Sequence, residues 1–134
     1  MSQENEELAH RAYDAFSSGD LEALLALTDP EVEFTSLVLE AEGGGGTYRG
    51  HEGVREYFES LRGVFADWHS EIVGTRAFGE MLVIQSHGVA TGGASGVRLE
   101  QDFWQAARVR DGKIVWWKFC RTEAEALEAV RLLE

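Results

Sequence analysis

The chain of 134 residues carries 24 acidic and 12 basic side chains, which gives a formal net charge of −12. Such a charge repels nucleic-acid phosphates and anionic lipid, so we expect neither nucleic acid nor membrane as a partner. A chain of this length buries about two-thirds of its unfolded surface and predicts one domain over residues 1–134. The single cysteine, Cys120, excludes an internal disulfide and, with no apolar run of membrane-spanning length, predicts a cytoplasmic protein.

Helical periodicity dominates the first part of the chain. Apolar residues at helical spacing predict a first helix that ends at Gly19, and Asp20 is placed to cap a second helix that stops before Pro30. A strand is predicted from Glu31, followed by a glycine-rich loop and a third helix over residues 50–62.

Strand patterns fill the second part of the chain. They are predicted over residues 68–76, 80–91, 97–109 and 113–120. A closing helix begins at Thr122, which forms a capping box with Glu125. Helices that precede a meander of strands predict an α+β fold. We expect a strongly curved antiparallel sheet of four to six strands, with a mixed edge, wrapped over three N-terminal-half helices as a cone-shaped barrel, plus a short C-terminal helix.

The hairpin around Asp111-Gly112 decides which side chains face the interior. A two-residue turn would place Gln105 opposite Lys118, whereas a three-residue loop with a bulge pairs Val109 with Lys113. We adopt the three-residue loop. The predicted inner face is then Gln101, Phe103, Gln105, Ala107, Val109, Val115, Trp117 and Phe119. The predicted outer face is Asp102, Trp104, Ala106, Arg108, Ile114, Trp116, Lys118 and Cys120.

Three segments carry a family resemblance: AYDAFSSGDLEALLALTDPEVEF, YRGHEGVREYF and RVRDGKIV. In their order and spacing they resemble the SnoaL-like, polyketide-cyclase-like branch of the nuclear-transport-factor-like and ketosteroid-isomerase-like superfamily. The resemblance covers nearly the whole chain and implies the same cone-shaped fold and a homodimer. It does not imply one activity, because this fold hosts isomerases, cyclases, hydrolases and non-catalytic binding modules.

The catalytic groups of those relatives have no counterparts here. The resemblance places the His and Asp of the polyketide cyclases at Gln105 and Phe119, neither of which takes up a proton near neutral pH. The base and the two oxyanion donors of the steroid isomerases fall at Phe34, Ala12 and Gln105. Tyr13 neighbours the tyrosine position, but one step along a helix turns a side chain by about 100°, so its role is not transferred.

Two polar residues remain as catalytic candidates. If the strand over residues 80–91 turns its odd positions inward, His87 is the one inward-facing base on a strand, beside Met81, Val83, Gln85 and Val89. The alternative is a hydrogen-bonded histidine in the core or on the outer face. Gln105 is expected to orient a ligand, and a structural hydrogen bond to a neighbouring strand is the alternative.

Other polar residues have simpler explanations. His51 and Glu52 open the third helix, where capping and the helix dipole account for them, and His10 and His69 lie in polar surroundings typical of the surface. Ser86 lacks the glycine-flanked setting of a nucleophilic serine. No metal-ligand spacing of His and Cys occurs, so we expect neither a metal nor another cofactor.

The combined prediction is a pocket for a small apolar or cyclic molecule, lined by Phe34, Gln101, Phe103, Gln105, Trp117 and Phe119. One hypothesis is an isomerase- or cyclase-type enzyme in which His87 accepts a proton while Gln105 polarises a carbonyl. The other is a non-catalytic ligand-binding or dimerisation module. Trp104 and Trp116 on the outer face predict a homodimer through that face, and packing on the chain's own C-terminal helix is the alternative.

Overall fold

The structure is a computed structural model that describes residues 2–36 and 46–133. These residues form an α+β fold, as predicted. The helices are α1 (Ser2–Ser18), α2 (Leu21–Leu27), α3 (Gly50–Val64) and α4 (Glu123–Leu133). The strands are β1 (Thr28–Ser36), β2 (Gly46–Arg49), β3 (Phe65–Phe78), β4 (Met81–Gly92), β5 (Arg98–Arg110) and β6 (Lys113–Cys120). The predicted glycine-rich loop lies outside the described residues except for Gly46.

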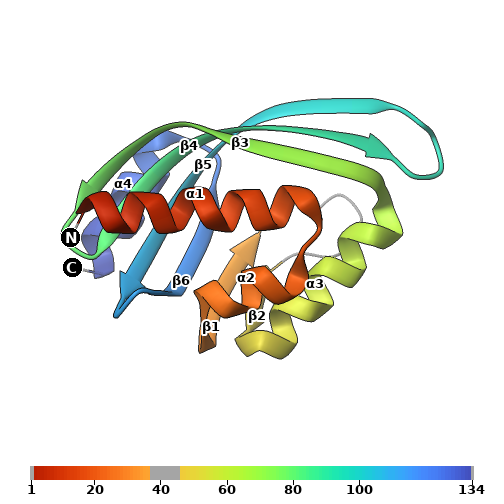
Figure 1. Cartoon of the computed structure of the whole chain (residues 1–134). Helices are drawn as coiled ribbons and strands as arrows, with labels where there is room; N and C mark the ends of the chain where they lie inside the picture. Colours follow the sequence, from red (N-terminus) through yellow and green to blue (C-terminus); the bar gives the residue numbers. More distant parts are fainter. Residues whose placement is uncertain (1, 37–45, 134) are drawn as a thin grey trace.

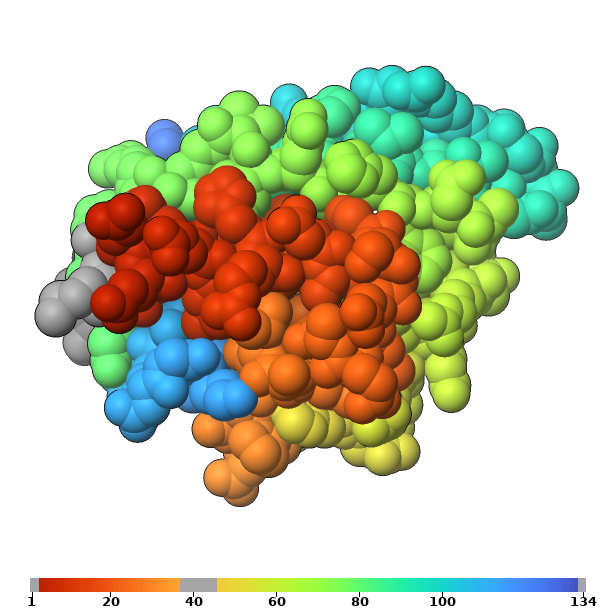
Figure 2. Space-filling model, in the orientation of Figure 1, coloured from red at the N-terminus to blue at the C-terminus, as the bar shows by residue number. Residues whose placement is uncertain are grey.

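The strands form one sheet in the order β2-β1-β6-β5-β4-β3. β1 runs parallel to β6 and every other neighbouring pair is antiparallel, so the predicted mixed edge is confirmed. Figure 1 shows α1 lying along one face of the curved sheet and α4 behind the other. We call the face that carries α1, α2 and α3 the concave face and the face that carries α4 the convex face. The ends of β4 and β5 project beyond α3, on the side away from both termini (Figure 2).

Side-chain caps fix where two helices start. The Asp20 Oδ1 atom accepts a hydrogen bond from the Ala23 N–H group at 3.0 Å, which confirms the predicted cap of α2. The Thr122 Oγ1 atom accepts from the Glu125 N–H group at 3.1 Å, and the Glu125 carboxylate accepts from the Arg121 N–H group at 2.6 Å. Thr122 therefore caps α4 as predicted, while Glu125 bonds back to Arg121, one residue before the N–H group that a capping box would use.

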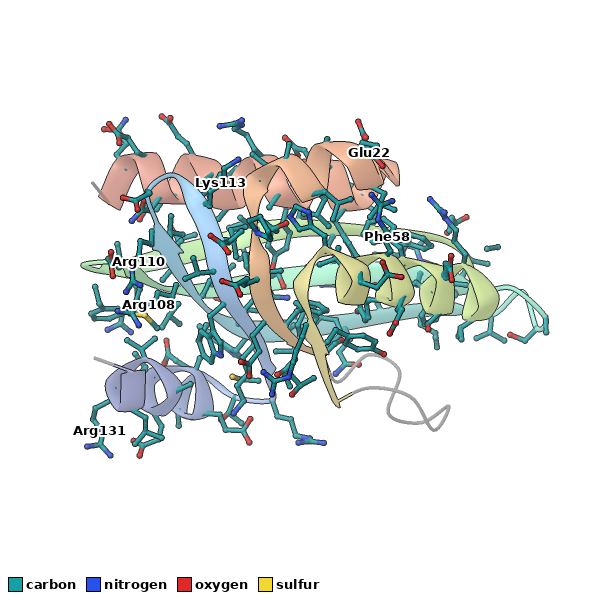
Figure 3. All side chains as sticks on the ribbon, turned by 90° about the horizontal axis from the view of Figure 1, so that it is seen from below. Glu22, Phe58, Arg108, Arg110, Lys113 and Arg131 are labelled. Carbon is teal, nitrogen blue, oxygen red and sulfur yellow. The ribbon has the colours of Figure 1, made fainter. Side chains whose placement is uncertain are left out.

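Each face of the sheet has its own apolar core. On the concave side, residues of α1, α2 and α3 pack on the sheet around Leu82 and Ile84, both fully buried. Phe58 points from α3 towards α1 (Figure 3), where its ring meets the Phe16 ring edge-on at 5.6 Å. On the convex side, Met81 and Val83 pack in a second cluster to which α4 contributes. The sheet is thus buried on both faces where these two clusters lie.

The β5–β6 hairpin differs from the prediction in its loop but not in its main consequence. Arg110 pairs with Lys113, so the loop has two residues, Asp111 and Gly112, both with positive φ angles of 52° and 74°. The predicted three-residue loop is wrong because Asp-Gly suits a two-residue turn that needs two positive φ values. The bulge lies one step further on, where Val115 is left without a partner.

That bulge restores the predicted side-chain direction for the rest of the hairpin. Beyond it, Gln105 pairs with Phe119 and Ala107 with Trp117, and directly paired residues share a face. Gln105 and Phe119 are therefore on the same, concave side. Ile114 belongs to the concave core, so its predicted place on the outer face is wrong.

The two outer-face tryptophans have a partner in their own chain. Trp104 and Trp116 pack against the convex cluster, which includes Ala126, Ala129 and Val130 of α4. This was the alternative to a dimer interface, so the tryptophans no longer require a second subunit. Among the described helices, none combines the length and the apolar character needed to span a bilayer.

Candidate functional site

A cavity of about 80 Å³ lies inside the cone, between the helices and the concave face of the sheet. Its walls are aromatic and aliphatic, with few polar side chains. The lining residues are Ala12, Tyr13, Phe16, Leu24, Thr28, Val32, Phe34, Val54, Tyr57, Phe58, Ser70, Gln105, Ile114, Trp117 and Phe119. Apolar concave sites with a few polar groups are typical of small-molecule binding.

Gln105 is the most unusual residue of this lining. It is 3% exposed on β5, between the paired residues Ile84 of β4 and Phe119 of β6. Its Oε1 atom is buried and makes no hydrogen bond within the described part of the chain. The alternative of a structural hydrogen bond to a neighbouring strand is therefore not what the structure has. An unpaired buried polar atom costs about 1–3 kcal/mol, so its presence in an apolar cavity needs an explanation.

Tyr13 is a lining residue that sequence reasoning set aside. It comes from α1, is 6% exposed, and its ring lies 5.8 Å from that of Trp117. Burial raises the pKa of the Tyr13 hydroxyl far above its ordinary value, an effect that the neighbouring Ser86 hydroxyl opposes only in part. Neither hydroxyl makes a hydrogen bond of good geometry within residues 2–36 and 46–133. Helical spacing could have identified Tyr13 as an inward-facing residue, since it follows buried Ala9 by one turn.

The other tyrosine of the cavity is paired. The Tyr57 and Ser36 hydroxyl oxygens are 2.9 Å apart, and burial raises the pKa of Tyr57 well above its ordinary value. The Thr28 hydroxyl likewise donates to the Leu25 carbonyl oxygen at 3.2 Å. Because burial raises both pKa values, Tyr13 and Tyr57 stay protonated at neutral pH. The unpaired atoms of Gln105, Tyr13 and Ser86 stand apart from these satisfied groups.

A second, larger hollow of about 360 Å³ opens next to the cavity, under the projecting ends of β4 and β5. We call it the outer groove. Its lining is Phe16, Leu61, Phe65, Trp68, Ser70, Gly88, Val89, Ala90, Leu99, Gln101, Phe103, Phe119 and Arg121. The predicted pocket residues are divided between the two hollows. Phe34, Gln105, Trp117 and Phe119 line the cavity, whereas Gln101, Phe103 and again Phe119 line the outer groove. Gln101 is exposed there and not buried as expected of an inner-face residue.

His87 does not reach either hollow. β4 pairs Ile84 with Gln105 and Ser86 with Phe103, so its even positions face the concave side and its odd positions the convex side. The condition that the odd positions of this strand face inward is therefore not met for Met81, Val83, Gln85 and His87, whereas Val89 lines the outer groove. His87 instead binds two carboxylates, with its Nδ1 atom 2.7 Å from Asp102 and its Nε2 atom 3.3 Å from Glu100. This is the outer-face alternative.

The remaining histidines also lie outside the cavity lining. The His51 Nε2 atom lies 3.0 Å from the Thr28 carbonyl oxygen, next to the start of α3, and His10 and His69 are exposed. Within the part of the chain that the structure describes, no three His, Cys, Asp or Glu side chains come together as a metal-binding group.

Comparisons with known proteins place the chain in a family and a fold. Residues 9–117 match the SnoaL-like domain family. No curated protein matches the chain. Among solved structures, an NTF2-like protein of unknown function from Burkholderia pseudomallei is 24% identical, with a TM-score of 0.79, over 93% of this chain and 95% of the other.

Two further similar structures are a complex with a small molecule and an enzyme. TerC, co-crystallised with polyporic acid, is 22% identical over 96% of this chain and 98% of its own, with a TM-score of 0.80. An LEH-like epoxide hydrolase of M. tuberculosis is 14% identical over 96% of this chain and 86% of its own, with a TM-score of 0.73. At these identities the similarity shows an NTF2-like fold.

Proposed function

Because the chain belongs to the SnoaL-like domain family and encloses an apolar cavity, we propose that it binds a small apolar or cyclic molecule there. The observation that carries this proposal is the buried, unpaired Oε1 atom of Gln105. A ligand that enters an apolar cavity gains by leaving water, and one that also pairs this atom removes its cost. TerC, a protein of the same fold, was co-crystallised with a small molecule, polyporic acid.

Binding without proton transfer is the version that the lining supports. The described side chains around the cavity include no carboxylate and no imidazole, and its tyrosines hold their protons because burial raises their pKa values. His87 lies on the opposite face of the sheet. The non-catalytic ligand-binding module is therefore our first candidate.

An isomerase- or cyclase-type step next to a carbonyl is the second candidate, because the Tyr13 hydroxyl is unpaired and can donate. In that case Tyr13 and the Gln105 amide would polarise the substrate oxygen, as hydrogen-bond donors placed where negative charge develops. The proton acceptor would have to come from the substrate or from outside the described lining. A protein of the same fold is an epoxide hydrolase, so this fold is compatible with catalysis.

Thermal stabilisation by a panel of small ring compounds, each with one hydroxyl or carbonyl group, tests the binding proposal. A ligand at 100 times its Kd stabilises a protein by about 2.7 kcal/mol, which raises Tm by several degrees. A Gln105→Leu variant should lose most of the shift given by the best compound. Gln85→Leu, on the convex face of β4, is the matched control and should keep it. No shift in the wild type would count against the pocket, and equal shifts in all three proteins would remove Gln105 from the binding.

A homodimer remains a separate proposal, supported by the family resemblance. Since Trp116 packs against the chain's own α4 cluster, replacing it would damage the fold as well as any interface. The direct test is the mass of the wild-type protein by light scattering. A dimer has about twice the 14.9 kDa of the chain, and a mass of one chain at micromolar concentration contradicts the proposal.

A further inference from the structure

The cavity and the outer groove are neighbouring hollows. Three side chains, Phe16, Ser70 and Phe119, line both of them. The Phe119 ring also meets the ring of Phe34 on the cavity side at 5.8 Å and the ring of Phe103 on the groove side at 5.5 Å. We call this shared part the neck. These rings are in edge-to-face contact, so a molecule that occupies both hollows must pass the neck beside them or push Phe119 aside.

The two compartments differ in size. The cavity holds about 80 Å³ and the outer groove about 360 Å³. Sites for drug-sized ligands span about 300–1,000 Å³, so the cavity alone accommodates one end of such a molecule. The larger part of the ligand belongs in the groove.

The two compartments also differ in their polar chemistry. In the cavity, the unpaired Gln105 Oε1 atom is an acceptor and needs a donor, while the unpaired Tyr13 hydroxyl can both donate and accept. A hydroxyl group on the ligand suits both atoms, since it can donate to the Gln105 oxygen and accept from the Tyr13 hydroxyl. A carbonyl group cannot donate to the Gln105 oxygen.

The groove offers an apolar surface that the fold itself does not cover. Leu99 lines it and remains 49% exposed, on the β5 segment that runs beyond α3. Val97, two residues before it, is 54% exposed but is not part of the lining. An apolar ligand tail that leaves the neck would lie against Leu99 and would not meet Val97.

We infer that the ligand is an elongated phenol or alcohol whose hydroxyl group reaches Gln105 and Tyr13, while its apolar tail passes the neck and lies in the outer groove. This inference rests on the proposed binding function and adds the shape, the direction and the functional group of the ligand.

A series of 4-alkylphenols, from phenol to 4-octylphenol, tests it by titration calorimetry, with tryptophan fluorescence from Trp117 in the cavity and Trp68 in the groove as a second readout. In the wild type, each added methylene should tighten binding about fourfold until the groove is filled. Leu99→Ser should leave the Kd of phenol unchanged and weaken 4-octylphenol several-fold. Val97→Ser should bind every member like the wild type.

The polar end has its own control. Replacing the hydroxyl by a methoxy group removes the donor, so 4-alkylanisoles should bind at least tenfold more weakly than the matching phenols, and Gln105→Leu should abolish that difference. If phenol binds but longer members gain nothing, or Leu99→Ser and Val97→Ser behave alike, the two-compartment inference is overturned and the proposed function stands. Failure of every member to bind overturns both.

Discussion

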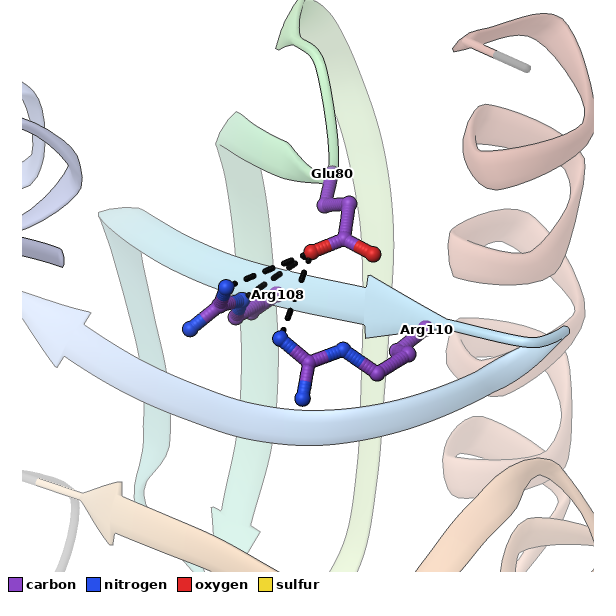
Figure 4. A network of polar contacts seen from close by, with 3 residues as sticks. All are labelled: Glu80, Arg108 and Arg110. Carbon is purple, nitrogen blue, oxygen red and sulfur yellow. Dashed lines mark hydrogen bonds and ion pairs between the residues drawn. The ribbon is translucent and has the colours of Figure 1, made fainter. Parts of the chain in front are cut away.

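The two faces of the sheet treat polar side chains in opposite ways. On the convex face, His87 binds Asp102 and Glu100, and Glu80 binds Arg108 and Arg110 at 3.3 and 3.5 Å (Figure 4). Inside the cone, three buried polar atoms have no hydrogen-bond partner among the described residues. Stability alone favours the first arrangement, and this is why we propose a ligand as the partner of the unpaired atoms.

The concave core should carry the largest share of stability. Phe58 is fully buried and its ring contacts the Phe16 and Trp68 rings. We expect Phe58→Ala to lower the free energy of unfolding by about 3–5 kcal/mol, because it leaves a cavity and removes apolar contacts. Urea denaturation measures this, and a loss below about 1 kcal/mol would mean that α3 does not pack on α1 as described.

Two buried tyrosines allow a matched comparison of paired and unpaired hydroxyls. Tyr57→Phe removes a hydroxyl bonded to Ser36 and should lower stability by about 1 kcal/mol. Tyr13→Phe removes an unpaired hydroxyl and should leave stability unchanged or slightly raised. Urea denaturation of both variants measures the difference. Equal losses would show that Tyr13 has a stabilising partner after all.

The His87 pair gives a pH-dependent effect on the convex face. The hydrogen bond that the His87 ring donates to the Asp102 carboxylate, together with Glu100, raises the pKa of His87 above its ordinary value of 6.5, although desolvation opposes this. A raised folded-state pKa stabilises the protein fully below pH 6.5, and this stabilisation is lost as the pH rises through the folded-state value.

His87→Gln should therefore reduce Tm at pH 5.5 and have little effect at pH 9. His69→Gln is the control, because His69 is exposed on β3 and forms no ion pair with a carboxylate within the described part of the chain. A His87→Gln effect that grows with rising pH would contradict the pairing, and proton titration of the His87 ring by NMR would check it independently.

The Glu80 cluster should give the smallest effect. The hydrogen bond from Arg110, with a further one from Arg108, lowers the pKa of Glu80, so its stabilising effect is present at neutral pH and lost as the pH falls through the folded-state value. Because these groups are exposed, we expect Glu80→Gln to lower Tm slightly at low salt and hardly at all at 1 M salt. A large decrease in Tm that is the same at low and high salt would mean that Glu80 stabilises the protein through the backbone turn and not through its charge.

The sequence predicted the fold because its local signals agree with one another. Asp20 and Thr122 cap the helices they were expected to cap, and Gln105 and Phe119 share the concave face. The exact hairpin register escaped prediction because both Ile114 and Val115 suit a buried strand, so nothing in their side chains reveals which one is bulged out.

The direction of β4 escaped prediction for a related reason. Residues 81–84 are all buried, since one core lies on each face of the sheet at this point. The alternation of apolar and polar residues that reveals a strand's inner face is therefore missing. The side of His87 therefore stayed open in the sequence, and the outer-face alternative is the one that the structure has. Tyr13 was set aside because the family's tyrosine position aligns with Ala12. The helical spacing of Tyr13 itself, which places it on the buried face of α1, was given less weight.

The central claim is that Gln105 is kept unpaired for a ligand at the expense of stability, and Gln105→Leu tests it most directly. In the absence of ligand, urea denaturation should show the variant to be more stable than the wild type by about 1 kcal/mol or more, because an unpaired buried amide is replaced by an apolar side chain of similar size. Gln85→Leu, on the convex face, should show no such gain. A Gln105→Leu protein less stable than the wild type would contradict the claim, since the amide would then have a structural role.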